Sequence, residues 1–229
     1  MEMDRHRPGH ILYTDQHALL TSDGTTTHLI AGNSTQRGYR EGVGADARFY
    51  LVRGLTQISE KLVVVADTDN HCMRLIDRNN HNTSVFRGQC KSYGYQYGCP
   101  GQFDFPWSVL IDQRDMNQLL ITDNSNYAVR TVDVMSSDVG TFIESDSLVF
   151  ITGITQDEKS GDLYVIADNA VYRLAYIQRT VSLITEYTGK NSNGFRDSTL
   201  LNSLFDWPDE LIFITPHTLL VADKENNKL

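Results

Sequence analysis

The chain has 229 residues, of which 40% are apolar and 21% charged, and it carries a formal net charge of -9 at pH 7. This length predicts one large domain or two small ones, and this composition excludes a disordered chain. The acidic balance disfavours nucleic acid as a partner, because neutralising phosphates requires clustered Lys and Arg. No run approaches the ~20 apolar residues that a membrane helix needs, so no membrane segment is expected.

The first ten residues, MEMDRHRPGH, carry charge and are not followed by an apolar core, so they do not form a signal peptide as written. We expect residues 1–8 to be an N-terminal extension. The compartment therefore stays open. An extracellular setting is favoured if the N-terminus is truncated, and a cytoplasmic one otherwise.

From residue 9 onwards, a short apolar run that ends in aspartate recurs along the chain. The runs ILYTD, LVVVAD, QLLITD, LYVIAD and LLVAD are spaced, from one aspartate to the next, by 52, 56, 45 and 55 residues. A repeat of this period is typical of propellers, whose blades are four-stranded sheets. The five aspartates are Asp15, Asp67, Asp123, Asp168 and Asp223.

Further residues recur at fixed distances from these aspartates. After Asp67 and Asp123 an asparagine follows by three residues and an arginine by seven, and after Asp168 an arginine follows by five. Segments ahead of three units, GYREGVGADARF, GYQYGCPGQF and GFRDSTLLNSLF, share a glycine, an aromatic residue and a final Phe. The recurring polar residues are Asn70, Asn126, Arg74, Arg130 and Arg173.

Each unit is predicted to contain four strands of 4–7 residues, rich in β-branched residues and bounded by Gly, Asp, Asn or Ser. Runs such as LVVVA are apolar on both faces, as in a strand packed between two sheets. We therefore expect an all-β propeller over residues 9–229. Its units are a partial first blade at 9–32, full blades at 33–88, 89–143 and 144–189, and a partial last blade at 190–229.

The segment DTDNHCMRLID, from Asp67 to Asp77, resembles the NHL repeat, which is the blade of a typically six-bladed β-propeller. DNSN at Asp123 fits the repeat less well, and the copies at Asp168 and Asp223 are degenerate. The resemblance covers roughly residues 9–229. It implies an NHL-type propeller of which this chain supplies about four to five blades, either as an incomplete ring or as an atypical small one.

Two interpretations of the repeated polar residues stay open. In the first, each aspartate holds the turn after the second strand by accepting backbone N–H groups, and each arginine pairs with it or with a neighbouring blade. In the second, the aspartates form a ring that binds a cation near the axis, for which calcium is suited, and the arginines form a basic patch. The histidines fall at no zinc-ligand spacing, so no cofactor is assigned, although calcium or zinc remains an alternative.

Residues 88–105, GQCKSYGYQYGCPGQFDF, form the most unusual segment, which we call the tyrosine loop. Tyrosines exposed in loops offer a large contact area at a low entropy cost. We therefore expect Tyr93, Tyr95 and Tyr97 to contact a protein partner. The alternative is that these side chains pack between blades.

Three cysteines are present, and no C-x-x-C spacing occurs. Cys90 and Cys99 bracket one loop and are expected to form a disulfide. The alternative is three reduced thiols, with Cys72 in the core.

The expected function is that of a non-catalytic scaffold that presents inter-blade loops to a protein partner. The family resemblance also implies two alternatives: a metal-dependent lyase or lactonase-like hydrolase with a site in the central channel, and RNA binding through one propeller face. The chain has no G-x-S-x-G nucleophile elbow and no phosphate-binding glycine loop. A catalytic carboxylate pair would not stand out among 29 acidic residues, so the sequence leaves enzyme activity open but less favoured.

Overall fold

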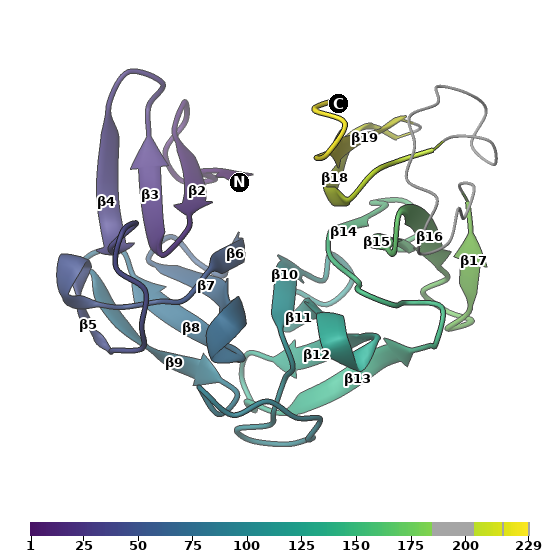
Figure 1. The fold of residues 1–229 in the computed structure, drawn as a ribbon, viewed down its shortest axis with the longest axis horizontal. Coiled ribbons are helices and arrows are strands. Elements are labelled where there is room, and N and C mark those ends of the chain that lie inside the picture. Colours follow the sequence, from purple (N-terminus) through teal and green to yellow (C-terminus); the bar gives the residue numbers. More distant parts are fainter. Residues whose placement is uncertain (185–203, 217, 229) are drawn as a thin grey trace.

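The computed structural model describes residues 1–184, 204–216 and 218–228. Their strands form antiparallel sheets placed side by side around a common axis, in an arc that is open on one side (Figure 1). Four of these sheets are blades, and a two-stranded unit follows them. The predicted all-β propeller is therefore confirmed as an incomplete ring. Most of the repeated segment at 194–205 lies outside the described residues.

In every complete blade the four strands pair in chain order, from the axis outwards. The first blade contains β1 (Glu2–Met3), β2 (Ile11–Asp15), β3 (Ala18–Ser22) and β4 (Thr27–Gly32). The second contains β6 (Val52–Gln57), β7 (Leu62–Asp67), β8 (Cys72–Asp77) and β9 (Asn82–Arg87), with β5 (Gly42–Val43) at its outer edge. The third contains β10 (Pro106–Ile111), β11 (Gln118–Asp123), β12 (Ala128–Asp133) and β13 (Val139–Glu144). The fourth contains β14 (Ile154–Gln156), β15 (Leu163–Ala167), β16 (Ala170–Leu174) and β17 (Val181–Leu183).

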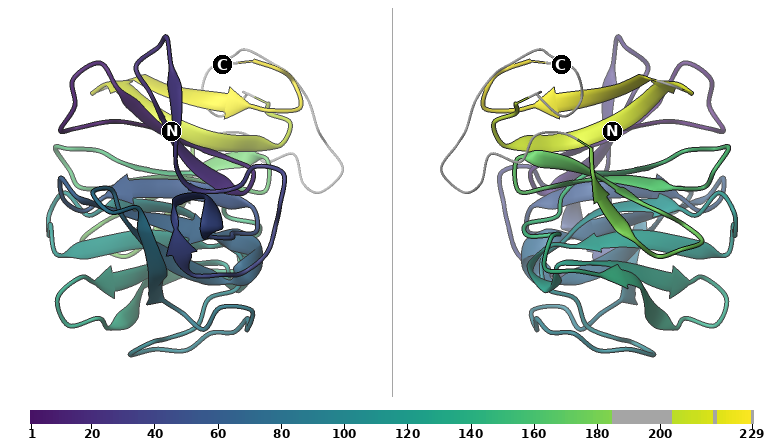
Figure 2. Two further views of the ribbon diagram at one scale, coloured as in Figure 1. Left: turned by 90° about the vertical axis from the view of Figure 1, so that its left-hand side faces the viewer. Right: turned by 90° about the vertical axis from the view of Figure 1, so that its right-hand side faces the viewer.

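The two-stranded unit contains β18 (Pro208–Thr215) and β19 (Thr218–Asp223). Together with the first blade it lies at the open side of the arc (Figure 1), and the side views show both at the same end of the molecule (Figure 2). Short 3-10 helices occur at η1 (Gly44–Asp46), η2 (Thr68–Asn70) and η3 (Asn124–Asn126). The structure adds β1 to the predicted partial first blade, from within the predicted N-terminal extension 1–8. A two-residue strand is too short to leave an alternating pattern, which is why the sequence did not indicate it. In the described residues no helix is both long and apolar enough to span a membrane.

Successive blades pack face to face through side chains that alternate along each strand. In β7, Val63 and Val65 belong to the core shared with the first blade, whereas Val64 and Ala66 belong to the core shared with the third. All four are fully buried. This alternation explains why LVVVA is apolar on both faces, because each side chain has a sheet opposite it. Burying one such valine contributes about 1.5–3 kcal/mol to folding.

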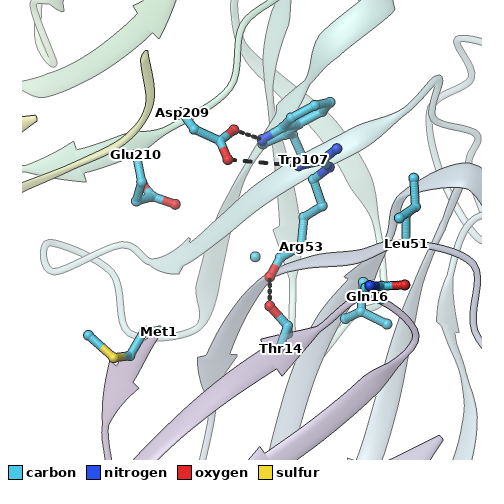
Figure 3. A pocket seen from close by; sticks show the side chains of 10 residues that line it. Met1, Thr14, Gln16, Leu51, Arg53, Trp107, Asp209 and Glu210 are labelled. Carbon is cyan, nitrogen blue, oxygen red and sulfur yellow. Dashed lines mark hydrogen bonds and ion pairs between the residues drawn. The ribbon is translucent and has the colours of Figure 1, made fainter. Parts of the chain in front are cut away.

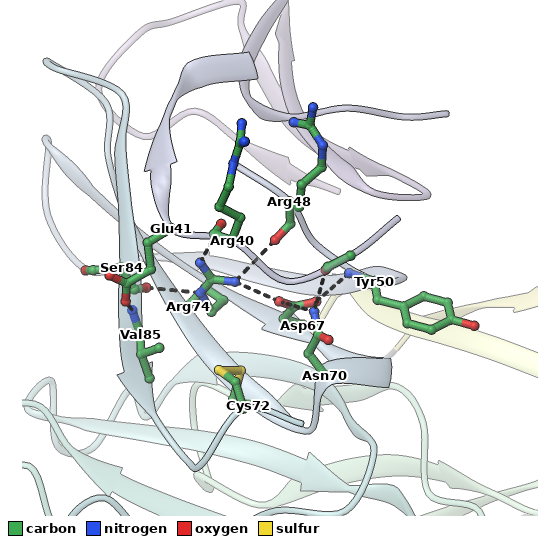
Figure 4. The surroundings of a disulfide bond; sticks show 12 residues. Arg40, Glu41, Arg48, Tyr50, Asp67, Asn70, Cys72, Arg74, Ser84 and Val85 are labelled. Carbon is green, nitrogen blue, oxygen red and sulfur yellow. Dashed lines mark hydrogen bonds and ion pairs between the residues drawn. A yellow bond between two sulfur atoms is a disulfide. The ribbon is translucent and has the colours of Figure 1, made fainter. Parts of the chain in front are cut away.

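A buried ion pair ties the second blade to the segment that precedes it (Figure 4). The guanidinium of Arg74 donates to Asp67 at 3.0 Å, and neither side chain is accessible to solvent. The other oxygen of Asp67 accepts the backbone N–H of Tyr50 at 2.7 Å, and Asn70 donates to the same carboxylate. The remaining N–H groups of the guanidinium donate to the backbone carbonyls of Arg40, Arg48 and Ser84.

The third blade repeats this arrangement with matching partners. Arg130 donates to Asp123 at 2.9 Å and to the carbonyls of Gln96, Gln102 and Gly140. Burial raises the pKa of Asp123 to about 6, against the opposing effects of its hydrogen bonds and of Arg130, so the carboxyl is ionised at pH 7.

The aromatic residues that recur ahead of each unit cover these buried guanidinium groups. The rings of Tyr39 and Phe49 lie 5.0 and 5.2 Å from the guanidinium carbon of Arg74. Tyr95 and Phe103 lie 4.2 and 5.5 Å from that of Arg130. The recurring Gly-aromatic segment, the final Phe, the aspartate and the arginine thus form one structural unit, in which each buried charge is fully hydrogen bonded.

The fourth blade departs from this pattern, and the expected pairing of Arg173 with Asp168 does not form. Arg173 instead pairs with Asp162 and is half exposed. The turn after β15 is only two residues long, so the position of the buried arginine is taken by Tyr172, which pairs with Val165. Arg173 is one residue further along the strand, and a shift of one residue moves a side chain to the opposite face of a sheet.

In the part of the chain that the structure describes, no such arginine pairs with the first or the last aspartate of the repeat. Asp15 is exposed at the end of β2. Asp223 is buried at the end of β19, where it accepts the backbone N–H of Asp206 at 2.7 Å and the side chain of Asn226 at 2.8 Å. Asp223 therefore holds its turn as Asp67 does, without the charge partner.

The disulfide joins Cys72 to Cys90, which corrects the expected pairing of Cys90 with Cys99. Cys72 begins β8 beneath the tyrosine loop, and a Cβ on Gly88 would lie 3.2 Å from its Cα. The start of the loop therefore passes directly over Cys72, a contact between segments 18 residues apart that the spacing of the cysteines does not reveal. Cys99 is free and exposed.

Mapping the thiols tests this pairing. In the protein oxidised under native conditions, we expect iodoacetamide to alkylate Cys99 within minutes and to leave Cys72 and Cys90 unmodified, because only Cys99 is both reduced and exposed. Peptide mass spectrometry without reduction reports both results. A peptide linked through Cys90 and Cys99 would contradict the structure.

Candidate functional site

The first strand of each blade lines the axis, and its residues occupy equivalent positions from blade to blade. Leu55, Val109, Ile154 and Leu211 correspond, since each pairs with the same position of the second strand. Two residues before them stand Arg53, Trp107, Thr152 and Asp209, and one residue before them stand Gly54, Ser108, Gly153 and Glu210.

Small residues fill the second of these positions in three blades because neighbouring first strands approach closely. A Cβ on Gly54 would lie 2.6 Å from the Cα of Ser108, and a Cβ on Gly153 would lie 2.9 Å from the Cα of Glu210. Glu210 is the exception, a long charged side chain at a position that is otherwise small.

A cavity of about 360 Å³, which we call the axial pocket, opens where these first strands begin. Arg53, Trp107 and Asp209 point toward one another in its wall (Figure 3). Its lining consists of Met1, Thr14, Gln16, Leu51, Val52, Arg53, Gly54, Trp107, Asp209 and Glu210. The pocket therefore brings together the first blade, the second, the third and the last two-stranded unit.

Arg53, Trp107 and Asp209 form a connected cluster across the axis. The guanidinium carbon of Arg53 lies 3.7 Å from the centre of the Trp107 ring, a cation–π contact. The indole N–H of Trp107 donates to Asp209 at 3.0 Å, and Arg53 forms an ion pair with the same carboxylate at 3.8 Å. Burial lowers the pKa of Arg53, an effect that Asp209 opposes. The Nε of Arg53 is buried and has no hydrogen-bond partner.

Glu210 lies beside this cluster but is not part of it (Figure 3). Its carboxylate is 3.5 Å from the hydroxyl of Ser108 and accepts the N–H of Leu211 at 3.4 Å. Desolvation raises the pKa of Glu210 to about 7, although the residue is exposed to solvent. No Lys or Arg among the described residues forms an ion pair with it.

In the second, third and fourth blades and in the last two-stranded unit, the residue immediately before the axial segment has a left-handed backbone. Glycine or asparagine adopts this conformation most cheaply, and large residues in it carry a strain of about 1–3 kcal/mol. The chain nevertheless has large apolar residues there, which we call the rim residues: Leu51, Phe105, Phe150 and Trp207, with φ of 53°, 54°, 51° and 50°. Leu51 and Phe105 are partly buried, whereas Phe150 and Trp207 are 45% and 60% exposed.

Side chains from the preceding blade hold three of these rim residues in place. The backbone N–H of Leu51 donates to His17 at 3.0 Å, and that of Phe105 donates to His71 at 3.2 Å. The N–H of Trp207 donates to Asn169, also at 3.0 Å. Each acceptor lies in the turn between the second and third strands of the preceding blade. The rim residues, these turns and the axial pocket are therefore on one face of the arc, which we call the turn face.

An aromatic surface extends outwards from the rim at the third blade. The ring of His71 packs against Phe105 with centroids 4.5 Å apart, and the centroid of the Tyr93 ring lies 5.7 Å from that of His71. Burial lowers the pKa of His71 despite the nearby Asp104 carboxylate, so the neutral ring accepts the N–H of Phe105. Tyr93 is 71% exposed, which brings one residue of the tyrosine loop onto the turn face.

The other two tyrosines of the loop have different surroundings. Tyr95 is partly buried against Arg130 and donates to Glu144 at 2.7 Å, so its position is fixed by the blade. Tyr97 contacts Tyr95 edge to face with centroids 5.6 Å apart and is 63% exposed. The loop therefore combines one packed tyrosine with two accessible ones.

Among the residues that the structure describes, no group of three or more His, Cys, Asp or Glu side chains is arranged to hold a metal ion. Asp67 and Asp123, which the sequence offered as members of a cation-binding ring, direct both carboxylate oxygens to protein donors. Sequence reasoning missed the axial cluster, whose members lie in unrelated segments. An alignment of the first strands by the aspartate that follows each of them would have shown Glu210 at a position where the other units have small residues.

Comparison with known proteins identifies the class of the fold. Residues in this chain match Protein SUPPRESSOR OF QUENCHING 1, chloroplastic, of Arabidopsis thaliana, with 35% identity over 86 residues, 35% of this chain and 8% of that protein. The chain thus spans a small part of the length of the curated relative that it matches. No protein-family model matches the chain.

Solved structures with a similar fold cover most of the chain. One is in the crystal structure of a nidogen/laminin complex, with a TM-score of 0.60 and 11% identity over 94% of this chain and 78% of that one. Another is an auxiliary nutrient binding protein from Bacteroides thetaiotaomicron, with a TM-score of 0.56 and 12% identity over 90% and 50% of the two chains. These likenesses concern the fold alone, and they make this protein a β-propeller.

Proposed function

We propose that this protein is a non-catalytic interaction module that binds a protein partner on the turn face, over the rim residues and the axial pocket. The observation that carries this proposal is the exposure of Phe150 and Trp207 beside the pocket. The ring contact of Phe105 with His71, in the turn of the preceding blade, explains why a large side chain stands at this strained position. Within the described ranges, no comparable ring contact accounts for a strained tryptophan at position 207.

Large exposed aromatic side chains around a polar depression are characteristic of binding surfaces, because they supply much contact area at a small entropy cost. Tyr93 extends this surface, and Tyr97 lies further out on the same loop, which supports the predicted role of these two tyrosines as contact residues. Tyr95 contributes indirectly by holding Tyr97.

We further propose that the units are NHL-type blades. The arrangement of Asp67, Asn70, His71 and Arg74 supports this, since each of these residues of the DTDNHCMRLID segment has a defined contact in the second blade. The Cys72–Cys90 disulfide supports an oxidising compartment, where such bonds persist.

Replacing two rim residues tests the proposed binding face. We expect the double variant Trp207→Ala and Phe150→Ala to recover the protein partner at least tenfold less than the native chain, because the variant loses the central apolar contacts. Affinity capture on the immobilised chain, followed by quantitative mass spectrometry, measures this recovery.

Met135→Ala is the matched control, since Met135 is 79% exposed in the turn after β12, away from the turn face. It should recover the partner as the native chain does. Equal recovery by the double variant, or an equal loss with Met135→Ala, would reject the turn face as the binding surface.

A further inference from the structure

The charges in the axial pocket are not balanced by protein contacts. Asp209 is committed to Trp107 and Arg53. Among the described residues, the one side chain that hydrogen bonds to the Glu210 carboxylate is that of Ser108, at 3.5 Å. The amino group of Met1 opposes the raised pKa of Glu210, and no ion pair joins the two groups in the described part of the chain.

The position of Glu210 makes this imbalance unusual. Its counterparts Gly54 and Gly153 closely approach the first strand of the next unit, whereas no described unit follows that of Glu210, which leaves room there for a longer side chain. A glutamate at this position places a carboxylate in the pocket beside an existing ion pair, where desolvation penalises its charge. A structural role would be served equally by a small residue, and a cation arriving from outside would compensate the charge.

The remaining walls fit an aliphatic chain that carries such a cation. Leu51 and Val52 line one part of the pocket, and the Trp107 ring lines another. Lysine and arginine side chains bury their methylene groups on apolar surfaces and keep their charged ends on polar partners. A volume of about 360 Å³ is sufficient for one such side chain.

We propose that the axial pocket accepts one basic side chain, a lysine or an arginine of the protein partner, and that Glu210 is the carboxylate that pairs with it. This inference rests on the proposed function, because the partner that supplies the side chain is the one bound by the turn face. Arg53 and Trp107 hold Asp209 in place, and the aliphatic part of the incoming side chain lies between Leu51 and Trp107.

The affinity for the basic side chain should then depend on pH. Glu210 binds a cation in its ionised form, and its raised pKa of about 7 leaves it largely protonated at pH 6. Asp209, Arg53 and the amino group of Met1 also face it, and the first two neutralise each other. Between pH 6 and pH 8 the affinity should rise about tenfold, as the carboxyl loses its proton.

Binding of small probes tests this site without knowledge of the partner. The chain has two tryptophans, so its NMR spectrum contains two indole N–H signals, and the Trp207→Phe variant assigns them. The probes are N-acetyl-arginine amide and N-acetyl-lysine amide, with N-acetyl-citrulline amide as the neutral isostere of arginine. We expect the two cationic probes to shift the Trp107 indole signal saturably and the citrulline probe to leave it unchanged.

Two variants test whether binding of the cationic probes requires the carboxylate of Glu210 or only the negative net charge of the chain. Glu210→Gln should lower the affinity for the cationic probes at least tenfold and abolish the dependence of that affinity on pH. Glu158→Gln removes an equal charge from an exposed turn and should bind them as the native chain does. Unchanged chemical shifts of the Trp107 indole in the free variants would establish that both are folded.

Any of three results would overturn the inference. The citrulline probe shifts the Trp107 signal as the cationic probes do, Glu210→Gln binds the cationic probes with unchanged affinity, or N-acetyl-glutamate amide binds saturably. These outcomes are independent of the proposed function. If Trp207→Ala and Phe150→Ala abolish partner recovery while the cationic probes fail to bind, the turn face stands and the basic side chain is wrong. If the probes bind and the double variant recovers the partner as the native chain does, the pocket for a basic side chain stands and the turn face is wrong as the binding surface.

Discussion

Replacing Asp123 by alanine is expected to lower the free energy of unfolding by about 3–5 kcal/mol. The substitution leaves the guanidinium of Arg130 fully buried without its counter-charge, and it removes the acceptor of Asn126 and of the backbone N–H of Asp104. Urea denaturation followed by circular dichroism measures the change. Asp146→Ala, at an exposed position, should change stability by less than about 0.5 kcal/mol.

A double variant distinguishes the loss of a charge partner from the loss of packing. Asp123→Ala combined with Arg130→Met should be more stable than Asp123→Ala alone, because no unpaired charge remains in the core. If the single variant is as stable as the Asp146→Ala control, the buried pair does not hold the third blade together.

Replacing Cys90 by serine is expected to cost about 3 kcal/mol, since the Cys72–Cys90 disulfide closes a loop between residues 18 apart in the unfolded chain. It also releases the start of the tyrosine loop from β8. Denaturation of the oxidised native chain and of the variant gives the difference. Cys99→Ser should have no effect on stability, because Cys99 is free. A comparable loss with Cys99→Ser would show that Cys99 is the partner of Cys90.

The fold could be predicted from the sequence because every unit repeats the same local constraints. The apolar strand before each aspartate and the aromatic residues before each unit recur, since each covers the same packing position. Arg173 could not be placed correctly, because β15 ends at Ala167, one residue before the aspartate, so that Arg173 stands one residue beyond the position of the buried arginine and on the other face of the sheet. The pairing of Cys90 depended on how the tyrosine loop crosses Cys72, which is a tertiary contact.

The candidate site was less accessible to sequence reasoning for a physical reason. Trp107 and Asp209 are 102 residues apart in the chain and meet only because the blades curve around an axis. The tyrosine loop attracted attention by its composition, and Tyr95 in it packs on Arg130 instead of facing a partner. The rim residues have no compositional signal, because one apolar residue per blade resembles any other residue of the core.

The inter-blade cores make this protein close to a one-dimensional array, in which each unit is stabilised by its nearest neighbours. Such arrays unfold from their ends. Backbone amide hydrogens are therefore expected to exchange fastest in the outer units and slowest in the central ones. The hydrogen bond between Trp107 and Asp209 is an exception, because it joins the last two-stranded unit directly to the third blade, which is not its nearest neighbour. A side chain bound in the axial pocket would add a second link of this kind, and occupancy would therefore couple the unfolding of the terminal unit to that of the central blades.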